Sequence, residues 1–233
     1  MKRILPCLII LFLSAPLAAA DRLPLEEVDL DAMIRETQKD VSQQDGTGLV
    51  WFMPEVPFFR LLSEGGNIPP REAAAIRAML KGKCVVIIVR AHISAFGSFT
   101  YFDEDTILAG TKISVQKPNR EPVVMRQLTD IPPDLTLIFN AMKPVLKNAI
   151  GPMGENMYFY VYDNVATDGT SIYDPYENEQ VQISFSQMGR LPKTTSTHDT
   201  ICDSLFKPRV LKNGKRAHVT WKFDPWTGEK IPE

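Results

Sequence analysis

The segment Pro132–Asp163 joins a helical pattern to a strand pattern across one tight corner, and it constrains the fold more than any other stretch. Apolar residues spaced at i, i+3, i+4 and i+7 predict a helix over about 133–150, with Pro133 in its first turn. Pro144 lacks the amide hydrogen that a helix interior requires, so we expect a kink or break there. Alternating aromatic residues predict a strand over 158–163. Neither face of this strand is polar throughout, so we expect it to be central in a sheet, with the helix on one side.

Shorter patterns along the rest of the chain predict further helices and strands. Helical spacing indicates two N-terminal helices, over 29–43 and 70–81, while the run 135–140 also suits a strand because its β-branched and aromatic residues favour that state. Alternating or apolar runs predict strands over 84–94, 111–116 as its partner, 180–186 and 217–223, and an edge strand or buried turn over 49–53. The pattern as a whole indicates an α+β fold, a mostly antiparallel sheet with two N-terminal helices and the kinked helix over about 133–150 packed on it.

The first twenty residues have the order of a secretory signal peptide, with Lys2 and Arg3 followed by an apolar run and by three alanines that end at Ala20. We expect cleavage after Ala20 and a protein that is periplasmic or secreted. A membrane anchor is the alternative, but the apolar run is shorter than the roughly 20 residues that a spanning helix needs. We therefore expect no stable membrane anchor after signal cleavage.

The charge of the cleaved chain argues against a nucleic-acid partner. Removing residues 1–20 from the 233 leaves 213 residues with 24 Lys and Arg against 28 Asp and Glu, a net charge of about −4 with histidine neutral. No basic block of the kind that neutralises phosphates stands out. The length suits one α+β domain over 21–200 followed by a short tail over 201–233.

The tail carries the one resemblance to a known family. Cys202-Asp203-Ser204-Leu205 and, further on, Trp221-Lys222-Phe223-Asp224-Pro225-Trp226-Thr227-Gly228 resemble a bacterial zinc-ribbon tail of the pattern C-x-x-C and W-x-F-C-P-W-C-G. In that family four thiolates hold one zinc ion. Only Cys202 is retained here, since Leu205, Asp224 and Thr227 stand at the other ligand positions, so the resemblance implies a framework that has lost its metal. The alternative is a C-terminal strand followed by a turn that packs Trp226 on the sheet.

Two cysteines, Cys84 and Cys202, remain after signal cleavage. An oxidising compartment makes a disulfide the default state of such a pair. We therefore expect a Cys84–Cys202 bond that ties the tail to the central sheet in place of the metal. The alternative is a nucleophilic thiol beside His92 or His218, which requires a lowered thiol pKa.

No local motif identifies a catalytic site. His92, Ser94 and Asp103 are the residues from which a hydrolase site would be built, and no G-x-S-x-G segment holds them together. His198 and His218 lack the i, i+4 partner that is typical of a metal-binding helix. We expect no cofactor and no metal, and an envelope hydrolase with a dispersed His, Ser and Asp site is the alternative function.

The strongest candidate for a binding loop is the corner of Gly151, Pro152, Met153, Gly154, Glu155, Asn156 and Met157. Methionine side chains repack against varied shapes, so a corner that presents two of them suits a partner surface. The alternative is a tight corner whose methionines fill the core. We expect an exported protein that acts by binding an envelope or extracellular protein. A shallow apolar patch around Met153, Met157 and Phe58 would favour binding, and a deep polar pocket with a histidine would favour the hydrolase.

Overall fold

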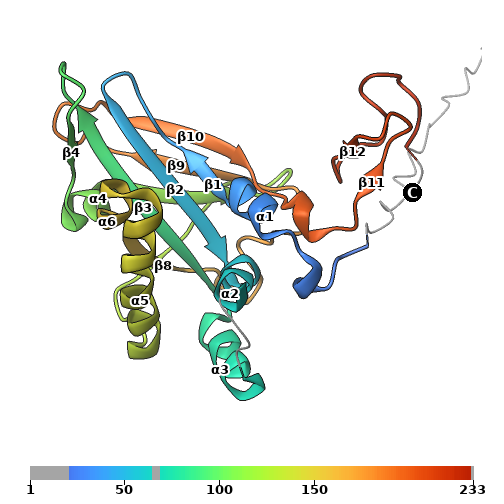
Figure 1. The fold of residues 1–233 in the computed structure, drawn as a ribbon, viewed down its shortest axis with the longest axis horizontal. Coiled ribbons are helices and arrows are strands. Elements are labelled where there is room, and N and C mark those ends of the chain that lie inside the picture. Colours follow the sequence, from blue (N-terminus) through green and yellow to red (C-terminus); the bar gives the residue numbers. More distant parts are fainter. Residues whose placement is uncertain (1–20, 65–68, 232–233) are drawn as a thin grey trace, which may run out of the picture.

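The computed structural model describes residues 21–64 and 69–231, which form two antiparallel sheets, a layer of helices and a small tail (Figure 1). The signal peptide predicted over 1–20 lies outside the described residues. The predicted α+β class with mostly antiparallel strands is confirmed. The strands are divided between two facing sheets and a separate hairpin, a division that the sequence pattern did not predict.

The large sheet is built around β3 (Lys83–Ile93). One edge of β3 pairs with β2 (Gly46–Pro54), and the other edge pairs with β8 (Tyr158–Asp163) and then with β4 (Phe99–Tyr101). The short strands β1 (Gln38–Asp40) and β7 (Gln127–Leu128) complete the order β1-β2-β3-β8-β7. The strands predicted over 84–94 and 158–163 are therefore confirmed, and both are central.

The second sheet has the order β10 (Thr194–Asp199), β9 (Gln180–Phe185), β5 (Thr111–Gln116) and β6 (Val123–Val124). It packs on one face of the large sheet, where Val86 and Ile88 of β3 share a core with Ile113 of β5 and Ile183 of β9. The prediction that 111–116 pairs with 84–94 is wrong, because β5 pairs with β9 along its whole length.

The opposite face of the large sheet is covered by α2 (Glu55–Glu64), α3 (Pro70–Leu80) and α5 (Pro133–Ile150) (Figure 1). The rings of Phe139 on α5 and Phe159 on β8 stack with centroids 4.8 Å apart. A single α5 helix continues through Pro144, so the predicted break is wrong, while a bend at Pro144 stays a prediction. The short helix α6 (Pro152–Glu155) follows at once.

The first helix is shorter than predicted. A 3₁₀ turn, η1 (Leu25–Glu27), leads into α1 (Leu30–Thr37), whose N-cap Asp29 accepts a hydrogen bond from the Ala32 amide. The chain leaves the helix after Thr37, whose hydroxyl donates to a carbonyl of the last turn and accepts from the Trp51 indole. Residues 38–40 pair with β2 instead of extending the helix to Gln43. Between β4 and β5, Asp103 caps the helix α4 (Glu104–Gly110).

The tail begins with a second 3₁₀ turn, η2 (Asp203–Leu205), and continues as a hairpin of β11 (Arg209–Val210) and β12 (Arg216–Ala217). The strand predicted over 217–223 ends at Ala217. The chain turns there because the Arg209 guanidinium gathers the carbonyls of His218, Val219 and Trp221, each at 2.9 Å. The hairpin and the residues after it have their own small core and stand away from the two sheets (Figure 1).

Candidate functional site

The corner predicted as a binding loop is packed on the protein's own core. Met157 is 2% exposed and Met153 is half-buried, and both belong to the cluster under α5 that also holds the fully buried Phe58. Gly154 lies against the carbonyl of Leu146, so the two helices meet closely. The methionines therefore fill the core as in the alternative interpretation, and Met153, Met157 and Phe58 do not form an exposed apolar patch.

The hydrolase residues are not brought together. The hydroxyl of Ser94 accepts the amides of Phe96 and Ser98 in the loop after β3, at 3.3 and 3.1 Å. Asp103 accepts the Thr106 amide at 2.8 Å as the cap of α4. No hydrogen bond joins either residue to His92 anywhere in 21–64 or 69–231, so both polar groups serve local turns.

The predicted Cys84–Cys202 disulfide is wrong, because both residues are free, buried thiols. Cys84 lies on β3 in the core between the two sheets, whereas Cys202 packs in a separate cluster with Val28 and Met33 beneath α1. Burial raises the pKa of Cys84 well above its ordinary value and raises that of Cys202 to about 12. Neither is therefore the thiolate that nucleophilic catalysis requires.

A polar pocket lies where α1, the end of β10 and the tail meet, and we name it the α1 pocket. Its volume is about 360 Å³, within the range of small-ligand sites. Three separate parts of the chain line it: Arg35, Glu36 and Lys39 from α1 and β1, Asn178, Asp199 and Ile201 from around β9 and β10, and His218 and Thr220 from the tail. Of these residues, only His218 was a candidate from the sequence, and no local motif marks the others.

The acidic groups of the α1 pocket are already engaged. The Glu36 carboxylate accepts the hydroxyl of the buried Ser204 at 2.6 Å and its amide at 3.1 Å. Burial raises the pKa of Glu36 above its ordinary value, and the bonds from Ser204 oppose that effect. The Asp199 carboxylate accepts the side-chain amide of Gln180 at 3.2 Å. Both carboxylates therefore have a donor of their own.

The basic groups are not paired with carboxylates. The Lys39 ammonium donates to two backbone carbonyls, those of Glu36 at 2.6 Å and Asp199 at 3.2 Å, and burial lowers its pKa. Arg35 is exposed and has no hydrogen bond or ion pair with any described residue. Among the described residues no carboxylate forms an ion pair with either cation, although the charges of Glu36 and Asp199 attract Lys39 from a greater distance and oppose the effect of burial on its pKa.

His218 adds an imidazole ring to this wall. Its Nδ1 atom accepts the Thr220 amide at 3.3 Å and lies 2.8 Å from the Thr220 hydroxyl. Since a backbone amide only donates, the neutral ring carries its proton on Nε2. The Ser204 hydroxyl is buried and donates to Glu36, and the Thr220 hydroxyl lies beside the same Nδ1 atom that accepts the Thr220 amide. The arrangement suits binding of an anionic group more than bond cleavage.

The zinc-ribbon positions of the tail have local structural roles. Asp224, at one of the former ligand positions, accepts the amides of Trp226 and Thr227 at 2.8 and 3.3 Å and closes the turn. Cys202 lies in the cluster beneath α1. The described ranges contain no group of three His, Cys, Asp or Glu residues placed to hold a metal ion. The resemblance to a degenerate ribbon stays a prediction.

Comparisons of this chain with family models, with curated proteins and with solved structures found no match.

Proposed function

We propose that this chain is an exported protein that acts by binding, and that the α1 pocket receives an anionic group of its partner. The observation that carries the proposal is the imbalance of the pocket wall. Lys39 and Arg35 are not paired with carboxylates, whereas Glu36 and Asp199 already accept hydrogen bonds from neighbouring side chains. A carboxylate or phosphate that reaches both cations gains charge-assisted hydrogen bonds without displacing an existing ion pair.

Export is supported by the order of charged, apolar and small residues before Asp21. In the part of the chain that the structure describes, no helix is long and apolar enough to cross a membrane. Expression in a bacterial host, followed by fractionation and N-terminal sequencing, tests this part of the proposal. A periplasmic product that begins at Asp21 supports it, and an unprocessed cytoplasmic product contradicts it.

Binding is tested by nuclear magnetic resonance on the chain without residues 1–20. We expect titration with a dicarboxylate or with inorganic phosphate to shift the amide signals of Asn178, Ile201 and Thr220. The double variant Arg35→Gln, Lys39→Gln should lose these shifts, because it removes both cations of the pocket. The control, Lys147→Gln, removes an exposed lysine of α5 that pairs with Glu155 and should titrate like the unsubstituted chain.

Two outcomes contradict binding at the α1 pocket: shifts confined to other parts of the chain, or pocket shifts that persist in the double variant. Comparing the two titrants separates a site for carboxylates from one for phosphates. Turnover of a generic ester or peptide that His92→Ala abolishes would instead establish the hydrolase.

A further inference from the structure

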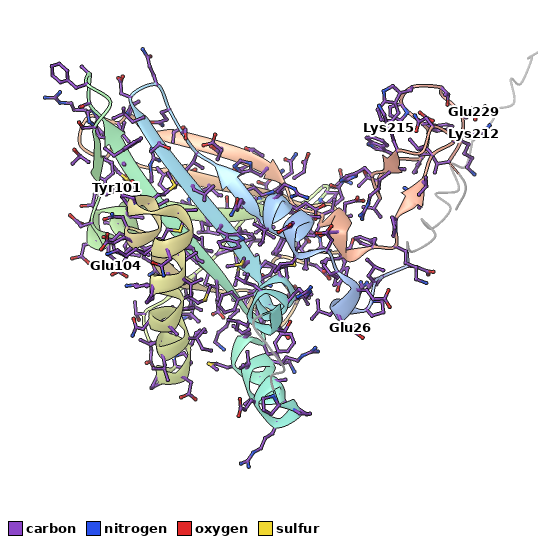
Figure 2. All side chains as sticks on the ribbon, in the orientation of Figure 1. Glu26, Tyr101, Glu104, Lys212, Lys215 and Glu229 are labelled. Atoms are coloured by element: carbon purple, nitrogen blue, oxygen red, sulfur yellow. The ribbon has the colours of Figure 1, made fainter. Side chains whose placement is uncertain are left out.

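The tail differs in charge from the rest of the protein. Residues 207–231, which we name the tail unit, carry seven Lys and Arg side chains against two acidic ones, a net charge of +5. Residues 21–206 carry 17 basic against 25 acidic side chains, a net charge of −8. The net charge of the whole chain does not reveal that the tail unit is basic and the rest acidic. Lys212 and Lys215 lie on the tail unit, well away from the sheets (Figure 2).

The tail unit also exposes large apolar side chains. Phe223 is 59% exposed, Trp226 is 55% exposed and Val210 is 67% exposed, while Trp221 and Ile231 turn into the unit's small core. Exposed aromatic rings beside lysines are typical of segments that lie at a membrane–water interface. The α1 pocket explains neither the charge of the tail unit nor its exposed apolar side chains, because the unit lines the pocket only through His218 and Thr220.

The exposed rings are held on a rigid turn. The Asp224 carboxylate accepts hydrogen bonds from the amides of Trp226 and Thr227. Gly228 closes the turn with a φ of +73°, and its amide donates a hydrogen bond to the Asp224 carbonyl. The Lys215 ammonium lies 4.4 Å from the centroid of the Trp226 ring, so a cation accompanies the exposed indole. A turn that is already ordered loses little conformational freedom when its tip meets a surface.

We propose that the tail unit docks on the surface of an anionic phospholipid bilayer, with Trp226 and Phe223 in the headgroup layer and Lys215 and Lys222 over the lipid phosphates. Charge complementarity favours an anionic partner, since the unit is cationic while the body of the protein is not. A bilayer is favoured over an acidic protein because a protruding turn with exposed rings needs a soft, flat surface and no matching cavity (Figure 1). The association is reversible, because it combines a few charges with shallow insertion and contains no spanning segment.

The test uses the chain without residues 1–20, since that apolar segment would itself enter lipid. Its cosedimentation with vesicles of phosphatidylcholine, with and without phosphatidylglycerol, is measured at low and high salt. We expect binding only to the anionic vesicles, weakened by salt. Each of Lys215→Gln and Lys222→Gln should lower the partition coefficient about fivefold, as expected for one cation near an anionic surface. Trp226→Ala should lower it further and abolish the blue shift of indole emission.

Matched controls lie on α5, which exposes the same residue types. Lys143→Gln removes an exposed lysine, and Leu137→Ala removes a side chain that is 69% exposed, so both should leave vesicle binding unchanged. Unchanged circular dichroism and thermal unfolding establish that each variant is folded. Equal binding to neutral vesicles, or binding that the α5 variants weaken and the tail variants do not, overturns the proposal. Absence of vesicle binding together with retention on heparin that Lys215→Gln weakens also overturns it and assigns the unit to a polyanion.

Discussion

Replacing Arg90 with methionine should make the protein more stable, although Arg90 is among the most buried side chains. Arg90 lies on β3 between the two sheets and is 1% exposed, and its Nε and Nη1 atoms have no hydrogen-bond partner in the described structure. Its guanidinium lies 4.2 Å from the centroid of the Phe185 ring. It forms no ion pair with any carboxylate of the described residues. Burial lowers the pKa of Arg90, as expected for a charge removed from water.

The expected gain follows from the balance of these contacts. Two buried donors without partners cost about 1–3 kcal/mol each. The contact with the ring of Phe185 returns about 2 kcal/mol at most. Methionine keeps the unbranched shape and adds apolar burial worth about 1.5 kcal/mol or more. These figures sum to a gain of about 1.5–5.5 kcal/mol, from which the cavity left by the smaller side chain subtracts. Arg90→Met should therefore raise the free energy of unfolding by about 1–4 kcal/mol, the range found when buried charges are replaced by apolar side chains.

Urea unfolding followed by circular dichroism measures the change, and an unchanged slope of free energy against urea shows that the comparison is valid. Arg190→Met is the matched control, because Arg190 is exposed in a turn and should change stability by about 0.5 kcal/mol or less. A loss of stability in Arg90→Met with a neutral control would refute the reasoning, since it would show that the guanidinium makes a net stabilising interaction.

Three further outcomes follow from the structure. Burial raises the pKa of Glu36, so the folded chain binds this proton more tightly than the unfolded chain does. The unsubstituted protein should therefore gain stability relative to Glu36→Gln as the pH falls from about 7 to about 4, and parallel plots of unfolding free energy against pH would contradict this. Gly154→Ala places a Cβ 2.0 Å from a carbonyl oxygen of α5 and should lower the free energy of unfolding by about 3 kcal/mol. Gly97→Ala, where only a positive φ is strained, should lower it by about 1–2 kcal/mol. Equal losses of stability in urea unfolding would argue against close packing at Gly154. Thiol titration of the chain without residues 1–20, done without reductant, should give no reaction in the native state and two thiols per chain after unfolding. No thiol after unfolding would mean that Cys84 and Cys202 are bonded.

The elements that sequence predicted correctly are those whose pattern reflects burial directly. β3 is apolar on both faces until Arg90 because a sheet covers one face and helices cover the other, and β9 alternates because only one of its faces is covered. The longest helical pattern, over 133–150, is likewise a helix. These patterns depend on the environment of each residue along the element and not on which strand lies beside it.

Predictions failed where distant partners decide the outcome. The polar segment Thr194–Asp199 is a strand because β9 supplies its hydrogen bonds, and β5 joins the second sheet for the same reason. The pattern Ala217–Phe223 suits a strand, yet Arg209 bends it into a turn through bonds that no local spacing reveals. Glu55–Glu64, for which no helix was predicted, forms α2 with Phe58 buried.

The candidate site was beyond the reach of local patterns for the same reason. Arg35 and Lys39 look like the solvated face of an N-terminal helix, and Thr220 looks like an outward strand residue. They become one wall only when the tail returns to α1, after more than half of the chain has intervened. The separation of charge between the tail unit and the body was readable from the sequence, but only by counting the segments separately.

Asp203 has a consequence for how the tail and the pocket communicate. Its carboxylate accepts the Val219 amide at 2.6 Å and pairs with Arg216 at 3.0 Å, so it ties the hairpin to η2. His218 and Thr220, on either side of Val219, line the α1 pocket. If the pocket binds the proposed anion, a ligand that contacts both α1 and the tail would favour this arrangement of the hairpin. By thermodynamic reciprocity, anything that favours the same arrangement would then raise the affinity for the ligand by the same factor.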